Sequence, residues 1–156
     1  MIKYVETRVV MSEVPDQITL AINLSNCWFG CPGCHSPHLW GDTGNELTFY
    51  ELDKLIRAND GIDCVCFMGE GSKNIHDLNR LMLHVKENYP DMKVAVFTGR
   101  DYIPDGINKE ALDYIKIGHY DTKLGGLNKK TTNQRMFKID HNTNEYVDLT
   151  SRFWIL

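Results

Sequence analysis

The chain of 156 residues has the size of one domain, and its 42% hydrophobic and 24% charged residues are typical of a folded globular protein, which excludes a disordered chain. Its 17 basic residues against 21 acidic ones leave a net charge of −4, which argues against a nucleic-acid-binding protein. No apolar run approaches the ~20 residues of a membrane span, and residues 1–10 lack the layout of a signal peptide. We therefore expect a single cytoplasmic domain over residues 1–156, with no nucleic-acid or membrane partner.

Strands and helices are predicted to alternate through the first three quarters of the chain. Apolar residues at every second position predict a strand at residues 17–24. A capping box that starts at Thr48, followed by apolar residues at helical spacing, predicts a helix at residues 48–59. A short apolar run then predicts a buried strand at residues 62–68, which ends at Gly69-Glu70-Gly71.

The alternation continues toward the C-terminus. A helical stripe of apolar residues at 75–85 is followed by a strand at 93–97, a short helix at 108–114 and a strand at 114–117. This order is typical of an α/β protein with parallel strands. In barrels built from βα units, the loops after the carboxyl ends of the strands carry the chemistry, so we expect the functional residues in those loops.

The last part of the chain has a different character. Residues 123–133 are rich in Gly, Lys, Thr and Asn and predict a mobile or binding loop. Apolar residues at 136–139 and 146–149 flank a polar turn and predict a hairpin. The apolar end at residues 153–156 is suited to covering an open barrel end or to meeting a partner.

Three cysteines stand close together directly after the first predicted strand. Cys27, Cys31 and Cys34 have C-x3-C-x2-C spacing. A cubane [4Fe-4S] cluster is ordinarily held by four cysteines, so three would leave one iron open, which indicates an enzyme rather than an electron carrier.

A structural zinc site, with His35 or His38 as the fourth ligand, fits the same spacing. The βα pattern favours the cluster, because zinc knuckles usually support small domains without a full core. A disulfide framework is disfavoured by the odd number of cysteines. The two remaining cysteines, Cys64 and Cys66, lie at i and i+2 of a predicted strand, and we expect both to be small core residues on one face.

Residues 27–40, CWFGCPGCHSPHLW, resemble the cluster loop of radical S-adenosylmethionine (SAM) activating enzymes, most closely the group that activates anaerobic ribonucleoside-triphosphate reductase. Three further triplets are similar to landmarks of this family, in the same order along the chain: Met68-Gly69-Glu70, Phe97-Thr98-Gly99 and Asn133-Gln134-Arg135. Two departures are present, because Met68 replaces the first glycine of a Gly-Gly-Glu turn and Gly71-Ser72-Lys73 replaces the Asp-Pro that often follows it.

The resemblance implies an α/β fold, an open partial (β/α) barrel of the radical SAM type with a C-terminal hairpin. The chain length agrees with a partial barrel, since a complete one typically needs ~250 residues. The implied activity uses Cys27, Cys31 and Cys34 to hold three irons of a [4Fe-4S] cluster while SAM chelates the fourth. An electron donor such as flavodoxin then drives the formation of a 5′-deoxyadenosyl radical. That radical installs a glycyl radical on the large subunit of anaerobic ribonucleotide reductase.

The resemblance also implies roles for individual residues. Glu70 is the expected acceptor for the SAM ammonium group, and Gly69, Thr98 and Gly99 are expected to contact SAM, with glycine permitting close backbone approach. Trp28 and His35 are expected beside the cluster, where they would shield it and donate a hydrogen bond. The side chains of Asn133-Gln134-Arg135 are expected to meet SAM or the partner protein.

Two other functions remain open at this point. The first is activation of another glycyl-radical enzyme, of the formate-lyase type. The Asn133-Gln134-Arg135 triplet and the short C-terminal part favour the reductase over this alternative. The second is a zinc-stabilised interaction module, in which metal binding would be coupled to folding.

Overall fold

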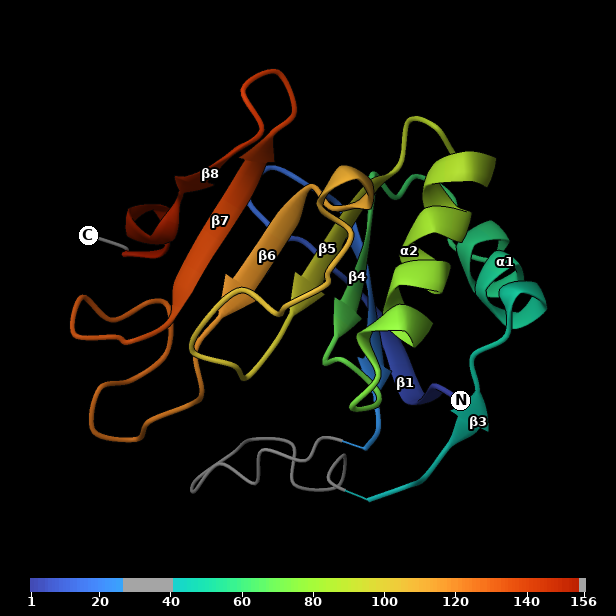
Figure 1. Cartoon of the computed structure of the whole chain (residues 1–156), viewed down its shortest axis with the longest axis horizontal. Coiled ribbons are helices and arrows are strands. Elements are labelled where there is room, and N and C mark those ends of the chain that lie inside the picture. The colour runs from blue at the N-terminus through green and yellow to red at the C-terminus, as the bar shows by residue number, and fades with distance from the viewer. Residues whose placement is uncertain (27–40, 155–156) are drawn as a thin grey trace.

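The computed structural model describes residues 1–26 and 41–154, and it folds them around one eight-stranded sheet (Figure 1). The strand order is β3-β1-β2-β4-β5-β6-β7-β8. The strands are Lys3–Val10 (β1), Thr19–Leu24 (β2), Asn45–Glu46 (β3), Cys64–Met68 (β4), Lys93–Phe97 (β5), Tyr114–Ile117 (β6), Arg135–Asp140 (β7) and Glu145–Asp148 (β8).

The centre of the sheet is parallel and its two sides are antiparallel. Strands β2, β4, β5 and β6 pair in parallel, whereas β1 with β3, and β7 with β8, add antiparallel strands at either side. Parallel strands are covered on both faces and therefore have nearly continuous apolar sequences. All six residues of β2 and the first four of β4 are accordingly buried.

Two helices cover one face of the sheet (Figure 1). Helix α1 (Phe49–Arg57) begins after Thr48, whose side chain accepts the N–H of Glu51 at 3.0 Å. Helix α2 (Ile75–Asn88) begins after Asn74, whose side chain caps it in the same way. Both predicted helices are confirmed. Their buried side chains pack on the sheet, and they are Leu52, Ile56, Leu78, Leu81, Met82 and Val85.

The opposite face of the sheet carries a second, smaller cluster. It contains Val14, Cys64, Cys66 and Met136, and Phe153 packs against it. Phe153 belongs to a C-terminal 3₁₀ helix, η3 (Thr150–Phe153). Phe153 is partly buried against this cluster, and the expectation that the apolar end covers a barrel opening or meets a partner stays a prediction.

The predicted strands and the C-terminal hairpin are present, but the short helix expected at residues 108–114 is wrong in length. Only a 3₁₀ turn forms there, η2 (Lys109–Ala111), because the chain is already extended at Leu112 as it enters β6. The sequence did not predict β1 or β3. Strand β1 is half exposed and is interrupted by a register shift between Tyr4 and Glu6, which removes the regular alternation of apolar residues.

The described residues thus form a mixed α/β fold, and the radical SAM type of partial barrel stays a prediction. None of the helices in residues 1–26 and 41–154 is both long enough and apolar enough to span a bilayer.

A buried carboxylate joins three elements at the amino ends of the parallel strands. Asp113, whose side chain is 6% exposed, forms an ion pair with Lys86 of α2 and accepts the N–H of Val94 at 2.9 Å. Its other oxygen lies 3.0 Å from Nε2 of His141, in the turn of the β7–β8 hairpin. Burial by itself would raise the pKa of Asp113, but the hydrogen bonds from Lys86, Val94 and His141 outweigh burial and lower it.

We expect Asp113→Asn to lower the free energy of unfolding at neutral pH by about 2–3 kcal/mol, because Lys86 loses its buried counter-charge. The pKa of Asp113 is lower in the folded chain than in the unfolded chain, so this stabilisation is present above the unfolded-state pKa. It is lost as the pH falls through the folded-state pKa. Urea unfolding at several pH values should show the difference from wild type shrinking on acidification. The exposed Asp105→Asn serves as control, and a pH-independent difference would contradict the prediction.

Candidate functional site

The carboxyl ends of the parallel strands lie together at one edge of the sheet, the lower edge in Figure 1, which we call the carboxyl edge. Met68 of β4 pairs with Phe97 of β5, and Phe97 pairs with Lys116 of β6. Neighbouring strands in a sheet are about 4.8 Å apart. The loops that begin at Gly69, Thr98 and Gly118 therefore lie side by side, as expected from the sequence.

An ion pair joins two of these loops. Arg100 donates from Nε to both carboxylate oxygens of Glu70, at 2.8 Å to Oε2 and 3.1 Å to Oε1. The hydroxyl of Thr98 also donates to Oε2, and the N–H of Arg100 donates to Thr98 Oγ1 at 3.2 Å. The Glu70 side chain is 2% exposed and that of Arg100 is 19% exposed. The hydrogen bond with Glu70 raises the pKa of Arg100.

The Glu70 carboxylate is held in place but retains capacity for a further donor. A carboxylate offers about four lone-pair positions. The donors described here use Oε2 twice and Oε1 once. The geometry therefore allows Oε1 to accept an ammonium group, and the role assigned to Glu70 from the sequence stays a prediction.

Arg100 is a site residue that the sequence reasoning missed. The sequence indicates a role for Arg100 only through its position, two residues after Thr98 in the same strand-end loop. From there a cation can reach an acid at the end of the neighbouring strand. Gly99 lies between these two residues and is half buried.

Glycine is required at two positions of the carboxyl edge. Gly69 and Gly118 have φ of 112° and 104°, a region that side-chain-bearing residues rarely adopt. The N–H of Gly69 donates to the carbonyl of Phe97 at 2.7 Å, which closes the turn after β4. A Cβ at Gly118 would lie 2.8 Å from Cα of Gln134, so the two chain segments approach too closely for any other residue.

The Asn133-Gln134-Arg135 segment lies at the same edge, because β7 runs antiparallel to β6 and begins beside its end. Gln134 donates from Nε2 to the carbonyl of Gly118 at 3.2 Å, and Asn133 donates from Nδ2 to the carbonyl of His119 at 3.1 Å. Oδ1 of Asn133 is buried and has no hydrogen-bond partner among the described residues. A buried acceptor without a partner is costly, so this oxygen is suited to accept a donor from a ligand.

The three cluster cysteines lie outside the described residues, as do Trp28 and His35. The residues on either side of them are described and meet at the carboxyl edge. The N–H of Asn26, just after β2, donates to the carbonyl of Gly41 at 3.0 Å, and Asn26 Nδ2 donates to Asp42 at 3.3 Å. The cysteine segment therefore leaves and rejoins the described chain beside the strand ends that carry Glu70 and Thr98.

The other two cysteines are core residues, as predicted. Cys64 and Cys66 are free thiols, fully buried on the second face of the sheet. Burial raises the pKa of Cys64 to about 12 and that of Cys66 well above its ordinary value. Both thiols are protonated at neutral pH and are therefore poor nucleophiles and poor metal ligands.

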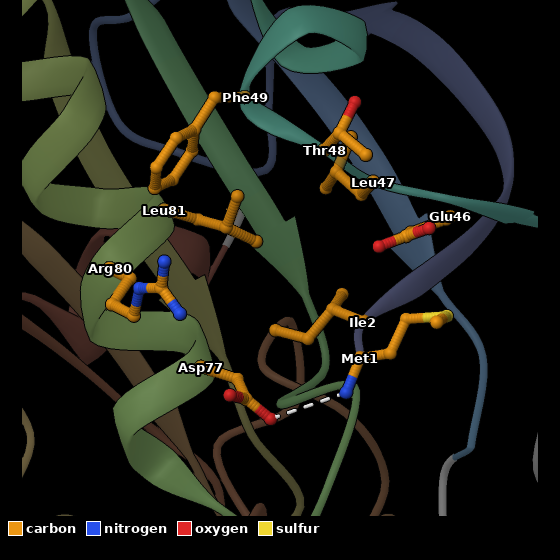
Figure 2. Close-up of a pocket in the computed structure, with 9 residues that line it drawn as sticks. All are labelled: Met1, Ile2, Glu46, Leu47, Thr48, Phe49, Asp77, Arg80 and Leu81. Atoms are coloured by element: carbon orange, nitrogen blue, oxygen red, sulfur yellow. Dashed lines mark ion pairs between the residues drawn. The ribbon is translucent and has the colours of Figure 1, made fainter.

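Residues 1–26 and 41–154 contain no group of three or more His, Cys, Asp and Glu side chains able to hold a metal ion. A cavity of 250 Å³ does open on the helix side of the sheet, beside Phe49 of α1 and Arg80 and Leu81 of α2 (Figure 2). The Met1 amino group forms an ion pair with Asp77 at its rim, at 3.5 Å. None of the residues lining it is a predicted site residue, so this cavity is separate from the carboxyl edge.

Comparison with known families gives one match. The family described as "4Fe-4S single cluster domain" matches residues 18–144, which include the three-cysteine segment and every described residue of the candidate site. Neither a curated protein nor a solved structure matches the chain.

We expect Arg100→Ala to lower the free energy of unfolding by about 3 kcal/mol, because it leaves the Glu70 carboxylate buried without its cation. Arg100→Lys keeps the charge and should recover part of this loss. Chemical denaturation of the full chain measures both variants. A wild-type stability in Arg100→Ala would show that the ion pair does not hold the two loops together.

We expect Gly118→Ala to be more destabilising than Gly61→Ala. Both glycines have positive φ, so each alanine costs about 1 kcal/mol of backbone strain. Only at Gly118 would the new methyl group also meet backbone, whereas nothing lies within 4 Å of the Cβ position at Gly61. Thermal unfolding compares the two variants directly. Equal losses would mean that the segments around Gly118 and Gln134 can separate freely.

Proposed function

Because the chain belongs to the family of 4Fe-4S single cluster domains, we propose that it is a SAM-dependent activating enzyme of the radical SAM type that installs a glycyl radical on the large subunit of an anaerobic ribonucleotide reductase. The observation that carries the proposal is the gathering of Gly69-Glu70, Thr98-Gly99 and Asn133 at one edge of the sheet. The ends of the cysteine segment, Asn26 and Gly41, meet at that same edge.

The environments of the cysteines support a cluster with one open iron. Two of the five cysteines are buried and protonated, and this leaves Cys27, Cys31 and Cys34 as the available thiolates. Soft thiolate ligands suit iron–sulfur clusters, and four irons held by three thiolates require one further ligand. We assign that ligand to the amino and carboxylate groups of SAM.

When bound, the cluster and SAM supply the reductive cleavage that yields the hydrogen-abstracting radical, with the electron coming from a donor such as flavodoxin. The residues of the chain position SAM for this step. Glu70 would accept the ammonium group on Oε1, while Arg100 and Thr98 hold its side chain in place. Gly69 allows the backbone to approach SAM closely, and Asn133 Oδ1 accepts a hydrogen bond from its nucleoside end.

The proposal predicts that anaerobic reconstitution gives a brown protein with about four irons and four sulfides per chain. It should cleave SAM when a reductant is present. Cys27→Ala, Cys31→Ala and Cys34→Ala should each remain folded by circular dichroism but lose the cluster and SAM cleavage. Cys64→Ala is the matched control and should keep both. A colourless protein that takes up one zinc, and that unfolds in Cys31→Ala, would instead establish a zinc-stabilised module.

The choice of partner is tested separately. The reconstituted protein is mixed under anaerobic reduction with either the reductase large subunit or a formate-lyase, and electron paramagnetic resonance detects the doublet of a glycyl radical. We expect the doublet on the reductase. A doublet on the lyase alone would keep the activating chemistry and overturn the assignment of its target.

A further inference from the structure

A second cavity lies at the amino ends of the parallel strands, at the end of the sheet opposite the carboxyl edge. In Figure 1 this is the upper end, where the β7–β8 hairpin turns. The cavity has a volume of 520 Å³ and is lined by residues of β5, β6, β7, β8 and the hairpin turn, including Lys93, Lys138, His141, Asp113, Tyr114 and Val147. Small-molecule sites typically have volumes of about 300–1,000 Å³, so the cavity has room for a ligand larger than a simple ion.

Two lysines reach this cavity from the same face of the sheet. Lys138 of β7 pairs with Tyr114 of β6, and Tyr114 pairs with Ala95 of β5. Lys93 lies two residues before Ala95 on β5. Because residues at i and i+2 of a strand share a face, Lys93 and Lys138 lie on the same face of the sheet, about 12 Å apart at the backbone. Within the described part of the chain neither ammonium group forms an ion pair, so both are available to an anion.

His141 adds a third polar group at the cavity, and its orientation is fixed. Its Nε2 lies 3.0 Å from Oδ1 of Asp113, and its side chain is 44% exposed at the cavity. The Asp113 carboxylate is itself nine-tenths buried and tied to Lys86 and the N–H of Val94. Since Nε2 is held by Asp113, Nδ1 is the ring nitrogen left for a ligand.

Each acidic residue near the cavity already has an ion-pair or hydrogen-bond partner. Lys86 compensates the charge of Asp113. Asp140 accepts the N–H of Asn142 at 2.9 Å and of Thr143 at 3.4 Å within the hairpin turn. Asp16 forms a bidentate ion pair with Arg152 at 2.7 Å, which lowers the pKa of Asp16, and Lys138 adds a smaller effect in the same direction. Asp140 keeps its negative charge, because backbone N–H groups orient a carboxylate without neutralising it. Since Asp113 and Asp16 have their own cations, Lys93 and Lys138 outweigh Asp140 and leave the cavity wall positive.

We propose that this cavity binds a small phosphorylated molecule, whose phosphate is held by Lys93, Lys138 and His141. The apolar or aromatic body of the ligand lies against Tyr114 and Val147. Phosphate oxygens accept charge-assisted hydrogen bonds from ammonium groups, and Lys93 and Lys138 supply two of them. The cavity is larger than a phosphate ion needs, and Tyr114, Ile139, Val147 and Leu149 give part of its wall an apolar surface. This site is independent of the function proposed for the carboxyl edge.

The test uses phenyl phosphate as the probe, with isothermal titration calorimetry on the full chain. Inorganic phosphate and phenol are the two comparison ligands, since each carries one half of the probe. We expect phenyl phosphate to bind most tightly, inorganic phosphate more weakly and phenol not measurably. Lys93→Ala and Lys138→Ala should each weaken phenyl phosphate binding by about 3–10-fold, and His141→Gln by a similar factor.

Lys130→Ala is the matched control, because Lys130 is exposed in the loop before Asn133, at the carboxyl edge. It should bind phenyl phosphate as wild type does. All four variants change exposed or partly exposed side chains and should keep the wild-type circular dichroism spectrum.

Each of the following results would overturn the proposal. They are no binding of phenyl phosphate to wild type at about 5 mM, equal affinities for phenol and phenyl phosphate, and unchanged affinity in both Lys93→Ala and Lys138→Ala. A loss in Lys130→Ala as large as in the cavity variants would also overturn it, because binding would then reflect net charge alone.

Discussion

A carboxylate removed from water needs a cation beside it, and this requirement determines the arrangement of the carboxyl edge. Glu70 follows β4 and is almost fully buried, while Arg100 and Thr98, which neutralise and orient it, follow β5. The two loops must therefore lie together for either to be stable. Gly69 and Gly118 add to this constraint, because their positive φ values allow turns in which the backbone of neighbouring segments approaches closely.

A buried carboxylate with a cation beside it also stabilises the other end of the sheet. Asp113 is buried and has Lys86 and His141 as partners, so it joins α2 and the β7–β8 hairpin to the parallel strands. A parallel strand of about five residues is roughly 16 Å long, so the two ionic clusters are well separated. The proposed cluster chemistry and the proposed phosphate site therefore lie at opposite ends of one rigid sheet, whose strands between them are apolar on both faces.

Much of the fold follows from local patterns in the sequence. The period of the apolar residues predicted α1, α2, the four parallel strands and the hairpin, because each of these elements buries one face or both. The period of the apolar residues did not predict β1 or β3, and the helix predicted at residues 108–114 is longer than η2. Strand β1 is half exposed with a register shift, β3 has only two residues, and η2 is limited by the distance to β6. In each case pairing with a neighbour, rather than a local period, decides the structure.

The sequence by itself determined the chemistry that is available: three clustered thiols, an acid after one strand and a Thr-Gly pair after the next, because residue type and spacing are local properties. The tertiary structure alone decided how these groups are used. It paired Glu70 with Arg100, left Asn133 Oδ1 buried without a partner, and placed Lys93, Lys138 and His141 around one cavity. Such contacts join residues up to dozens of positions apart. They depend on the order and direction of the strands, which no local pattern specifies.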